Sequence, residues 1–292
     1  MIDLHVHTKI SDNSLSADEV IRLAKVKGIT HLAITDHDTT KGLKEAITLG
    51  QEIGVIIVPG IEISAYDYQR KKKAHILGLF IEPGHPALDL LCKSLVQSRN
   101  QASAEMVKRI IVAGYDISWE EVRKYEGGTG VYKQHIMHAL LDKGYCESIY
   151  CDLYKKLFQK GSTSESEGIA YIPLDYIDAR VAIPAIRAAG GIAVLAHPGQ
   201  LSNFDAIDEW VELGLEGIEV FHPSHNEEDR QMSSRYAQKH NLITTGGSDF
   251  HGFYGDKPVE MGCLNLDEAC IFQLLARKKR DVMENDKLLG SN

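Results

Sequence analysis

Short apolar runs alternate with longer amphipathic stretches along most of the chain. The runs predict β-strands at seven places: 2–6, 31–36, 55–59, 74–81, 192–196, 217–221 and 242–246. Between them, apolar positions recur every three or four residues and predict helices that begin near residues 17, 40, 176, 205, 227 and 267. This alternation is typical of an α/β protein with a TIM-like (β/α)7 barrel of mostly parallel strands.

The stretch from residue 84 to residue 168 follows a different pattern. Long helical periods at 88–112 and 132–141 are separated by glycines. We interpret this stretch as a helical insertion over the mouth of the barrel. The predicted organisation is therefore a barrel domain of residues 1–83 and 169–292 and an α-helical insertion (cap) domain of residues 84–168.

Composition and charge restrict the location and the partners of the protein. The chain has 292 residues, 43% hydrophobic and 25% charged, with five cysteines and no C-x-x-C pair. It lacks both a signal-peptide pattern and an apolar run of about 18 residues, so we expect a cytoplasmic protein with free thiols and no membrane partner. A net charge of −9 argues against a long nucleic acid as the main partner but allows a small phosphorylated substrate held by cations. The oligomeric state stays open.

Histidine and carboxylate side chains stand at or just after nearly every predicted strand. His5 and His7 alternate with apolar residues, so both rings leave the same face of the first strand. Later strand ends carry Thr35-Asp36-His37-Asp38, Gly60-Ile61-Glu62, Ala74-His75, Ala196-His197-Pro198 and Ser248-Asp249-Phe250-His251. Because barrel strands present their carboxyl ends on one face, the pattern indicates a polynuclear metal site. Its mixed nitrogen and oxygen donors suit Mn, Fe or Zn.

These motifs resemble those of the PHP (polymerase and histidinol phosphatase) phosphoesterases over nearly the whole chain, most closely the stand-alone bacterial type with a helical insertion. The resemblance implies a distorted seven-stranded barrel with a trinuclear site for three divalent metal ions, with Mn as first choice. The implied ligands are His5, His7, Glu62 and Asp249 for one ion, Glu62, His75 and His197 for a second, and Asp12, His37 and His251 for a third.

A site of this kind is suited to phosphoester hydrolysis. Two cations that share a water lower its pKa, so that a metal-bridging hydroxide can attack phosphorus in line. We expect Glu62 and His197 to act in this catalytic centre. Relatives suggest small phosphate esters as substrates, namely nucleotides, oligonucleotide ends, sugar phosphates or cyclic phosphodiesters, and the choice between monoester and diester stays open.

Further residues are candidates for proton transfer and substrate binding. His222 and His225 follow a predicted strand, where they could protonate the leaving group or bind phosphate. Within the insertion, Arg99, Lys133 and His135 are candidates to bind a second phosphate or a sugar. Relatives commonly have Arg at the position of Lys133, and lysine lacks the bidentate fork of arginine.

Three residues near the ligands are expected to support them. Asp3 and Asp36 are predicted to accept hydrogen bonds that fix the tautomers of histidine rings. Asn13 stands where relatives usually carry Gly, and we expect it to adopt the left-handed conformation that Asn tolerates.

Two other functions compete with phosphoester hydrolysis. Amidohydrolase-type cleavage of C–N bonds uses similar barrels and ions, but the third ligand group, around Asp12, is better suited to gripping a phosphoryl group. A metal-stabilised non-catalytic module is opposed by the apparently complete ligand set.

Overall fold

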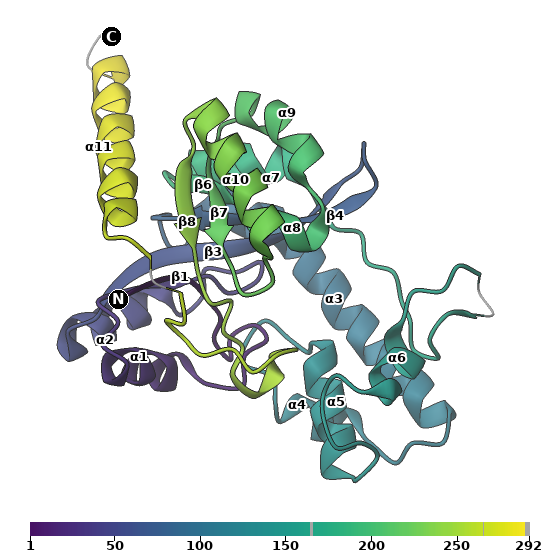
Figure 1. The fold of residues 1–292 in the computed structure, drawn as a ribbon. Helices are drawn as coiled ribbons and strands as arrows, with labels where there is room; N and C mark the ends of the chain where they lie inside the picture. Colours follow the sequence, from purple (N-terminus) through teal and green to yellow (C-terminus); the bar gives the residue numbers. More distant parts are fainter. Residues whose placement is uncertain (164–165, 265, 290–292) are drawn as a thin grey trace.

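The structure is a computed structural model that describes residues 1–163, 166–264 and 266–289, with side chains of the last helix described as far as residue 279. A single curled sheet forms its centre (Figure 1). In spatial order its main strands are β1 (Ile2–Val6), β2 (His31–Ile34), β3 (Ile56–Asp67), β4 (Lys72–Leu79), β6 (Ile192–Leu195), β7 (Leu215–Phe221) and β8 (Ile243–Gly246). All seven predicted strands are present, and the predicted α/β fold class is confirmed.

The sheet is parallel except at β4, which runs antiparallel to both of its neighbours, β3 and β6. β3 forms a hairpin with β4 and extends as far as Asp67, beyond its predicted end. Near that end, β3 also pairs with a two-residue strand that was not predicted, β5 (Ile177–Asp178). At the other edge, Val6 bridges to Phe250, and the backbone N–H of Asp249 donates to the carbonyl of His5 at 2.8 Å. These contacts join β1 to the segment after β8 and curl the sheet into a distorted barrel.

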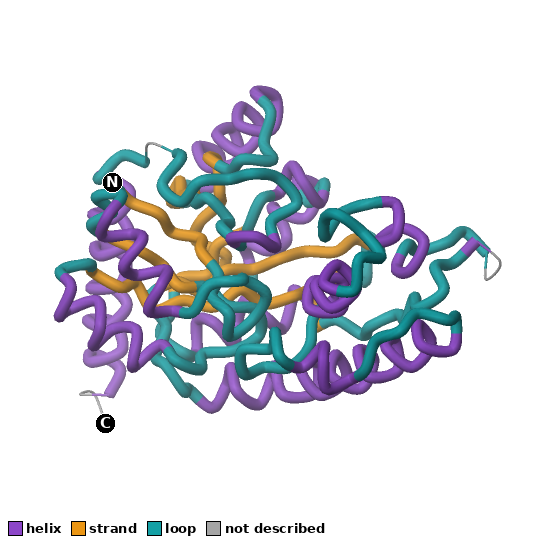
Figure 2. Tube along the Cα trace, turned by 90° about the horizontal axis from the view of Figure 1, so that it is seen from below, coloured by secondary structure: helices purple, strands orange, loops and turns teal. Residues whose placement is uncertain are grey.

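Helices surround the strands, as Figure 2 shows. They are α1 (Ala17–Val26), α2 (Leu43–Ile53), α7 (Ala179–Ala188), the short α8 (Pro198–Leu201), α9 (Ile207–Glu212), α10 (Glu227–His240) and α11 (Ala269–Leu289). Ser16 and Asn226 begin α1 and α10 with capping boxes, which explains why both helices start where predicted. The first turns of α11 pack on the barrel, and the helix then extends away from it (Figure 1). Within the described residues, none of the helices has the length and apolar character needed to cross a bilayer.

The described part of the predicted insertion contains four α-helices: α3 (Pro86–Val112), α4 (Trp119–Arg123), α5 (Lys133–Asp142) and α6 (Asp152–Phe158). The long helices α3 and α5 begin within two residues of their predicted starts, whereas α4 and α6 are too short to show a helical period. The N-terminal half of α3 packs in the barrel core, and its C-terminal half packs in a second apolar cluster with α5 and α6. We call this second group the insertion cluster. It includes Tyr254, which follows β8 in the chain.

Candidate metal centre

The nine residues predicted as metal ligands meet at one end of the sheet. They come from strands, strand ends and the loops that follow, and are His5, His7, Asp12, His37, Glu62, His75, His197, Asp249 and His251. Parallel strands present their carboxyl ends on the same side, which explains how residues from both ends of the chain become neighbours. His75 arrives differently, because the antiparallel pairing of β4 with β3 places it beside Glu62.

Glu62 lies at the middle of the centre and is only 1% exposed. Its Oε2 is 3.2 Å from His5 Nε2 and 3.1 Å from His7 Nε2. Its Oε1 is 2.7 Å from His75 Nδ1 and 3.1 Å from His197 Nε2. Oε2 is also 3.3 Å from His37 Nδ1, so nitrogen donors face both oxygens, as they would face a carboxylate that bridges two cations.

Asp249 completes the group around His5 and His7. Its Oδ1 lies 3.4 Å from His5 Nε2 and 3.2 Å from His7 Nε2. The four ligand atoms of His5, His7, Glu62 and Asp249 all lie within 4.8 Å of one another. This group of four is the set that the resemblance implies for one ion.

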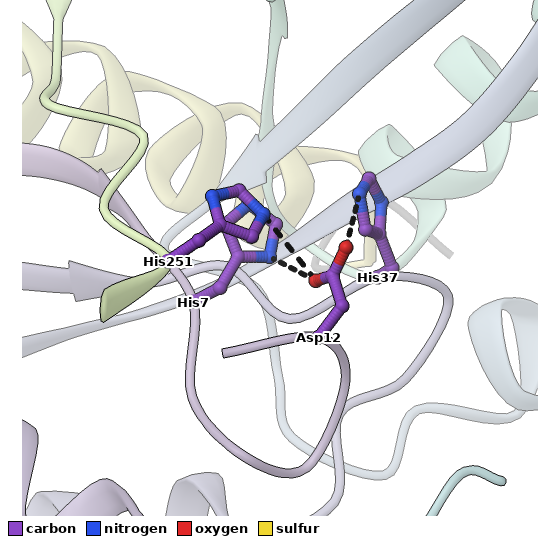
Figure 3. A group of neighbouring side chains, drawn as sticks. All are labelled: His7, Asp12, His37 and His251. Carbon is purple, nitrogen blue, oxygen red and sulfur yellow. Dashed lines mark ion pairs between the residues drawn. The ribbon is translucent and has the colours of Figure 1, made fainter. Parts of the chain in front are cut away.

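A third group surrounds Asp12 and is drawn in Figure 3. Asp12 Oδ1 is 3.4 Å from His251 Nε2 and 3.5 Å from His7 Nδ1, while Oδ2 is 3.9 Å from His37 Nε2. His7 therefore contributes one ring nitrogen to this group and the other to the group around Asp249. This shared histidine was not part of the third ligand set expected from the sequence.

The donor set fits divalent cations. His5 Nε2 and His7 Nε2 lie 3.2 Å apart, and two facing lone pairs at this distance need a proton or a cation between them. One buried oxygen each of Asp12 and Asp249 also lacks a hydrogen-bond partner. Cations bound in the two groups would satisfy these atoms.

The electrostatics lead to the same conclusion. Burial alone lowers the pKa of His7, yet the facing carboxylates of Asp249 and Glu62 raise that pKa to about 10. Burial raises the pKa of Glu62 and of Asp249, but the surrounding histidines hold both well below their usual range. The buried carboxylates thus demand compensating positive charge, which protons on the imidazoles or bound cations supply.

Glu219 on β7 supports the centre and was missed in the sequence. It is fully buried, and His5 Nδ1 donates to its Oε1 at 3.1 Å. Because a carboxylate only accepts, this contact leaves the lone pair of His5 Nε2 directed at Glu62 and Asp249. The other oxygen accepts the backbone N–H of His197 at 2.8 Å. A carboxylate within an otherwise apolar predicted strand was the available signal.

The predicted roles of Asp3 and Asp36 are corrected by their partners. Asp36 accepts from the backbone and hydroxyl groups of Thr8 and Ser11, and so shapes the loop that carries Asp12. Asp3 accepts hydrogen bonds from backbone N–H groups, and those of Ser248 and Gly262 each lie 2.8 Å from its carboxylate oxygens. Neither carboxylate hydrogen-bonds a histidine ring, because nearby backbone and hydroxyl donors occupy their oxygens.

The backbone takes unusual conformations where the strands deliver ligands. His197 has φ 28° and Asp249 has φ 52°, in the left-handed region that non-glycine residues rarely adopt. Asn13, in contrast, was expected to adopt the left-handed conformation but does not. Its buried amide donates to the carbonyls of His7 and Phe250, both at 2.9 Å, and ties the end of β1 to the segment after β8.

The two histidines after β7 have different surroundings. His222 is 3% exposed, and its Nε2 lies 3.5 Å from Asp249 Oδ2 without a hydrogen-bond partner. His225 donates from Nδ1 to the carbonyl of Val220 and accepts the N–H of Gly199 at Nε2. Both ring nitrogens of His225 are thus bound to backbone, so this arrangement leaves neither for a substrate.

A basic pocket adjoins the metal centre beneath the insertion. Its volume is about 230 Å³, and its lining includes His37, His75, Lys73, Arg99 and Lys133. Burial, together with the positive charge of Lys73, lowers the pKa of Lys133 to about 8. Within the described residues, Lys133 has no carboxylate at ion-pair distance.

The other two substrate-binding candidates are held by the protein itself. The guanidinium of Arg99 donates to Asp38 at 2.5 Å and also to Ser64 and Tyr132. The fully buried His135 accepts the backbone N–H of Tyr132 at Nδ1, and burial lowers its pKa to about 4. Of the three candidates, Lys133 is therefore the one without an ion pair or side-chain hydrogen bond within the described residues, and its Nζ lies 5.4 Å from the centre of the Phe158 ring.

Comparison with known proteins identifies the family. The PHP domain model matches residues 3–160 of the chain. The chain belongs to the PHP domain family. A solved structure of a protein from Bifidobacterium adolescentis, classed as a metal-dependent phosphoesterase, matches with a TM-score of 0.83 and 29% identity, covering 94% of this chain and 96% of that one.

Curated PHP-like relatives carry phosphoesterase names. A phosphoribosyl 1,2-cyclic phosphate 1,2-diphosphodiesterase from Eggerthella lenta is 44% identical over 88% of this chain and 96% of its own length. A 3',5'-nucleoside bisphosphate phosphatase from Chromobacterium violaceum is 31% identical over 86% of this chain and 87% of its own. A 5'-3' exoribonuclease, Rnm, from Escherichia coli is 31% identical over 85% of this chain and 84% of its own. The PHP protein is therefore a phosphoric ester hydrolase, as the sequence predicted.

Proposed function

We propose that this PHP enzyme hydrolyses a cyclic phosphodiester carried by a phosphorylated sugar. The observation that supports this choice most directly is the half-buried Lys133, which has no carboxylate partner within the described residues and lines a pocket that also contains the ligand candidates His37 and His75. A substrate that reaches from the ligands to Lys133 needs one phosphoryl group at each end. The 44% identical relative named for a phosphoribosyl cyclic phosphate supports the same substrate class.

The size of the pocket favours a compact substrate. Its volume of about 230 Å³ lies below the range of roughly 300–1,000 Å³ that is usual for sites of drug-sized ligands. A pentose with one phosphate in this pocket would place its second phosphoryl group among the ligand groups. The net charge of −9 opposes a long nucleic acid at the same place.

We assign the nine ligand residues to three divalent cations, with Mn preferred over Fe or Zn. Bound there, such cations supply Lewis-acid charge for phosphoryl oxygens and lower the pKa of a water near Glu62 and His197. Two side chains have the remaining roles, substrate binding and proton transfer. Lys133 binds the remote phosphate, and His222, whose Nε2 faces Asp249 without a hydrogen-bond partner, gives a proton to the leaving oxygen.

Two matched substrates test the proposal. Ribosyl 1,2-cyclic phosphate with and without a 5-phosphate differ only in the group assigned to Lys133. We expect kcat/KM to be about 10- to 100-fold higher with the 5-phosphate, because a hydrogen bond to a charged group contributes about 1.5–3 kcal/mol. The variant K133A should lose this preference and keep its rate on the smaller substrate. Equal rates of the unmodified enzyme on both substrates would contradict the proposal.

A nucleoside 3',5'-bisphosphate is the second candidate. Tyr154 and Tyr176 line the same pocket as Lys133, and tyrosine rings can stack a nucleobase. The 31% identical phosphatase from Chromobacterium violaceum carries this substrate in its name. Competition between the two substrates in one assay decides between them, since the preferred one will suppress turnover of the other at equal concentration.

A further inference from the structure

The third ligand group takes two of its side chains from loop segments that contact the insertion. His5, Glu62 and His75 are on strands of the sheet. Asp12 lies in the loop between β1 and α1, and His251 lies in the segment after β8. Loops without a partner vary in position more than strands do, so these two side chains need support from elsewhere.

Helix α5 of the insertion supports the first of them. Gln134 Nε2 donates to Asp12 Oδ2 at 3.4 Å and to the hydroxyl of Tyr150 at 3.2 Å. This contact engages one carboxylate oxygen, while the buried Oδ1 has no hydrogen-bond partner and faces His7 and His251. The amide therefore orients the carboxylate without occupying the oxygen that faces two of the histidines.

The loop that carries Asp12 is also pressed against the insertion. The hydroxyl of Thr129 donates to the carbonyl of Ile10 at 2.5 Å. Gly127 packs against the carbonyl of Lys9 so closely that a Cβ atom there would lie 1.5 Å from its oxygen. These contacts fix the loop just before Asp12.

The same helix supports the segment of His251. Tyr254 is 2% exposed, packs in the insertion cluster, and places its hydroxyl 2.8 Å from His138 Nδ1 on α5. Its backbone N–H donates to the carbonyl of His251 at 3.1 Å. In contrast, no hydrogen bond within the described residues joins the insertion to Glu62, His75 or His197.

We propose that helix α5 completes the third metal site, with Gln134 and Tyr254 as its positioning residues. A displacement of α5 moves Asp12 and His251 together and leaves the group around Glu62 in place. The inference rests on the proposed metal binding. It adds that metal binding at the third site, around Asp12, depends on the insertion.

Counting Mn²⁺ ions on the full-length protein tests this. Metal-free unmodified protein, Q134A and Y254F are titrated with Mn²⁺ alone, and bound ions are counted by native mass spectrometry and calorimetry. We expect both variants to bind one of three ions about 10- to 100-fold more weakly, which is the usual cost of removing a group that orients a metal ligand. The other two ions should bind as before.

Matched controls come from the insertion itself. Gln159 donates to the carbonyl of Ser166, the Tyr145 hydroxyl accepts the N–H of Asp116, and neither side chain lines the basic pocket. Q159A and Y145F should keep three ions at unmodified affinity. Y254F retains the ring and its packing, so it separates positioning from folding. If Q134A and Y254F both bind three ions with unmodified affinity, or lose affinity equally for all three, the inference is overturned while the proposed function stands. If the unmodified protein binds no ion, the proposed function is overturned as well.

Discussion

At the scale of single residues, the proposed metal sites depend on which nitrogen of each histidine faces the carboxylates of the centre. Glu219 decides this for His5, because its carboxylate accepts from Nδ1 and leaves Nε2 directed at Glu62 and Asp249. The same carboxylate holds the backbone of His197, whose φ of 28° is strained. One residue thus orients ligands in two groups.

Replacing Glu219 with glutamine tests this role. The amide keeps the shape of the side chain but removes the charge, so E219Q should bind Mn²⁺ about 10- to 100-fold more weakly. Calorimetric titration of metal-free protein measures the change. E216Q is the control, because Glu216 lies on the same strand and pairs with Arg277 outside the centre. Identical affinities of E219Q and E216Q would contradict the role.

Lys133 leads to a prediction about pH. Its pKa of about 8 means that it is charged below pH 8 and loses the charge as the pH rises through that value. KM for a substrate with a remote phosphate should therefore rise between about pH 7 and pH 9. K133R should remove this dependence, since arginine keeps its charge throughout. A KM of the unmodified enzyme that stays constant over this range would argue against the contact.

The gathering of the nine predicted ligand residues could be foreseen because histidines and carboxylates recur at or just after the predicted strands. Glu219 was not predicted, because its role depends on His5, which is 214 residues away in the chain. The occupied nitrogens of His225 depend on backbone contacts that a sequence pattern does not contain.

At the scale of elements, continuous apolar runs marked the strands and capping residues marked the helix starts. Strand direction was not visible in the same pattern, so the antiparallel β4 and the long β3 hairpin appeared only in the structure. The two-residue β5 and the short helices α4 and α6 are below the length at which a period can be recognised.

The junction of β1 with the segment after β8 depends on Asn13. Its amide makes hydrogen bonds to two carbonyls, and its Oδ1 accepts the N–H of Leu15 at 2.9 Å. N13A leaves these buried groups without partners and should lower the free energy of unfolding by about 1–3 kcal/mol. Urea denaturation with a metal chelator present measures this without a contribution from bound ions. An unchanged urea midpoint would show that the hydrogen bonds of Asn13 do not contribute to stability.

At the scale of the whole molecule, four carboxylates lie among histidines at the end of the barrel, the buried Asp12, Glu62 and Glu219 and the partly exposed Asp249. Cations that bind only the folded chain stabilise it by mass action. At free Mn²⁺ of 100 times the dissociation constant, each ion should add about 2.7 kcal/mol. Thermal unfolding with Mn²⁺ or with a chelator measures the change in Tm. A Tm that is the same with Mn²⁺ and with chelator would contradict this arrangement.

The central claim is that ligands from the whole length of the chain gather to bind cations that drive phosphoester hydrolysis. The most direct test is phosphate release from the cyclic phosphodiester as metal-free enzyme is reloaded stepwise with Mn²⁺. We expect no measurable hydrolysis without metal and a rate that rises with the number of ions bound. A full hydrolytic rate after exhaustive chelation would contradict the claim.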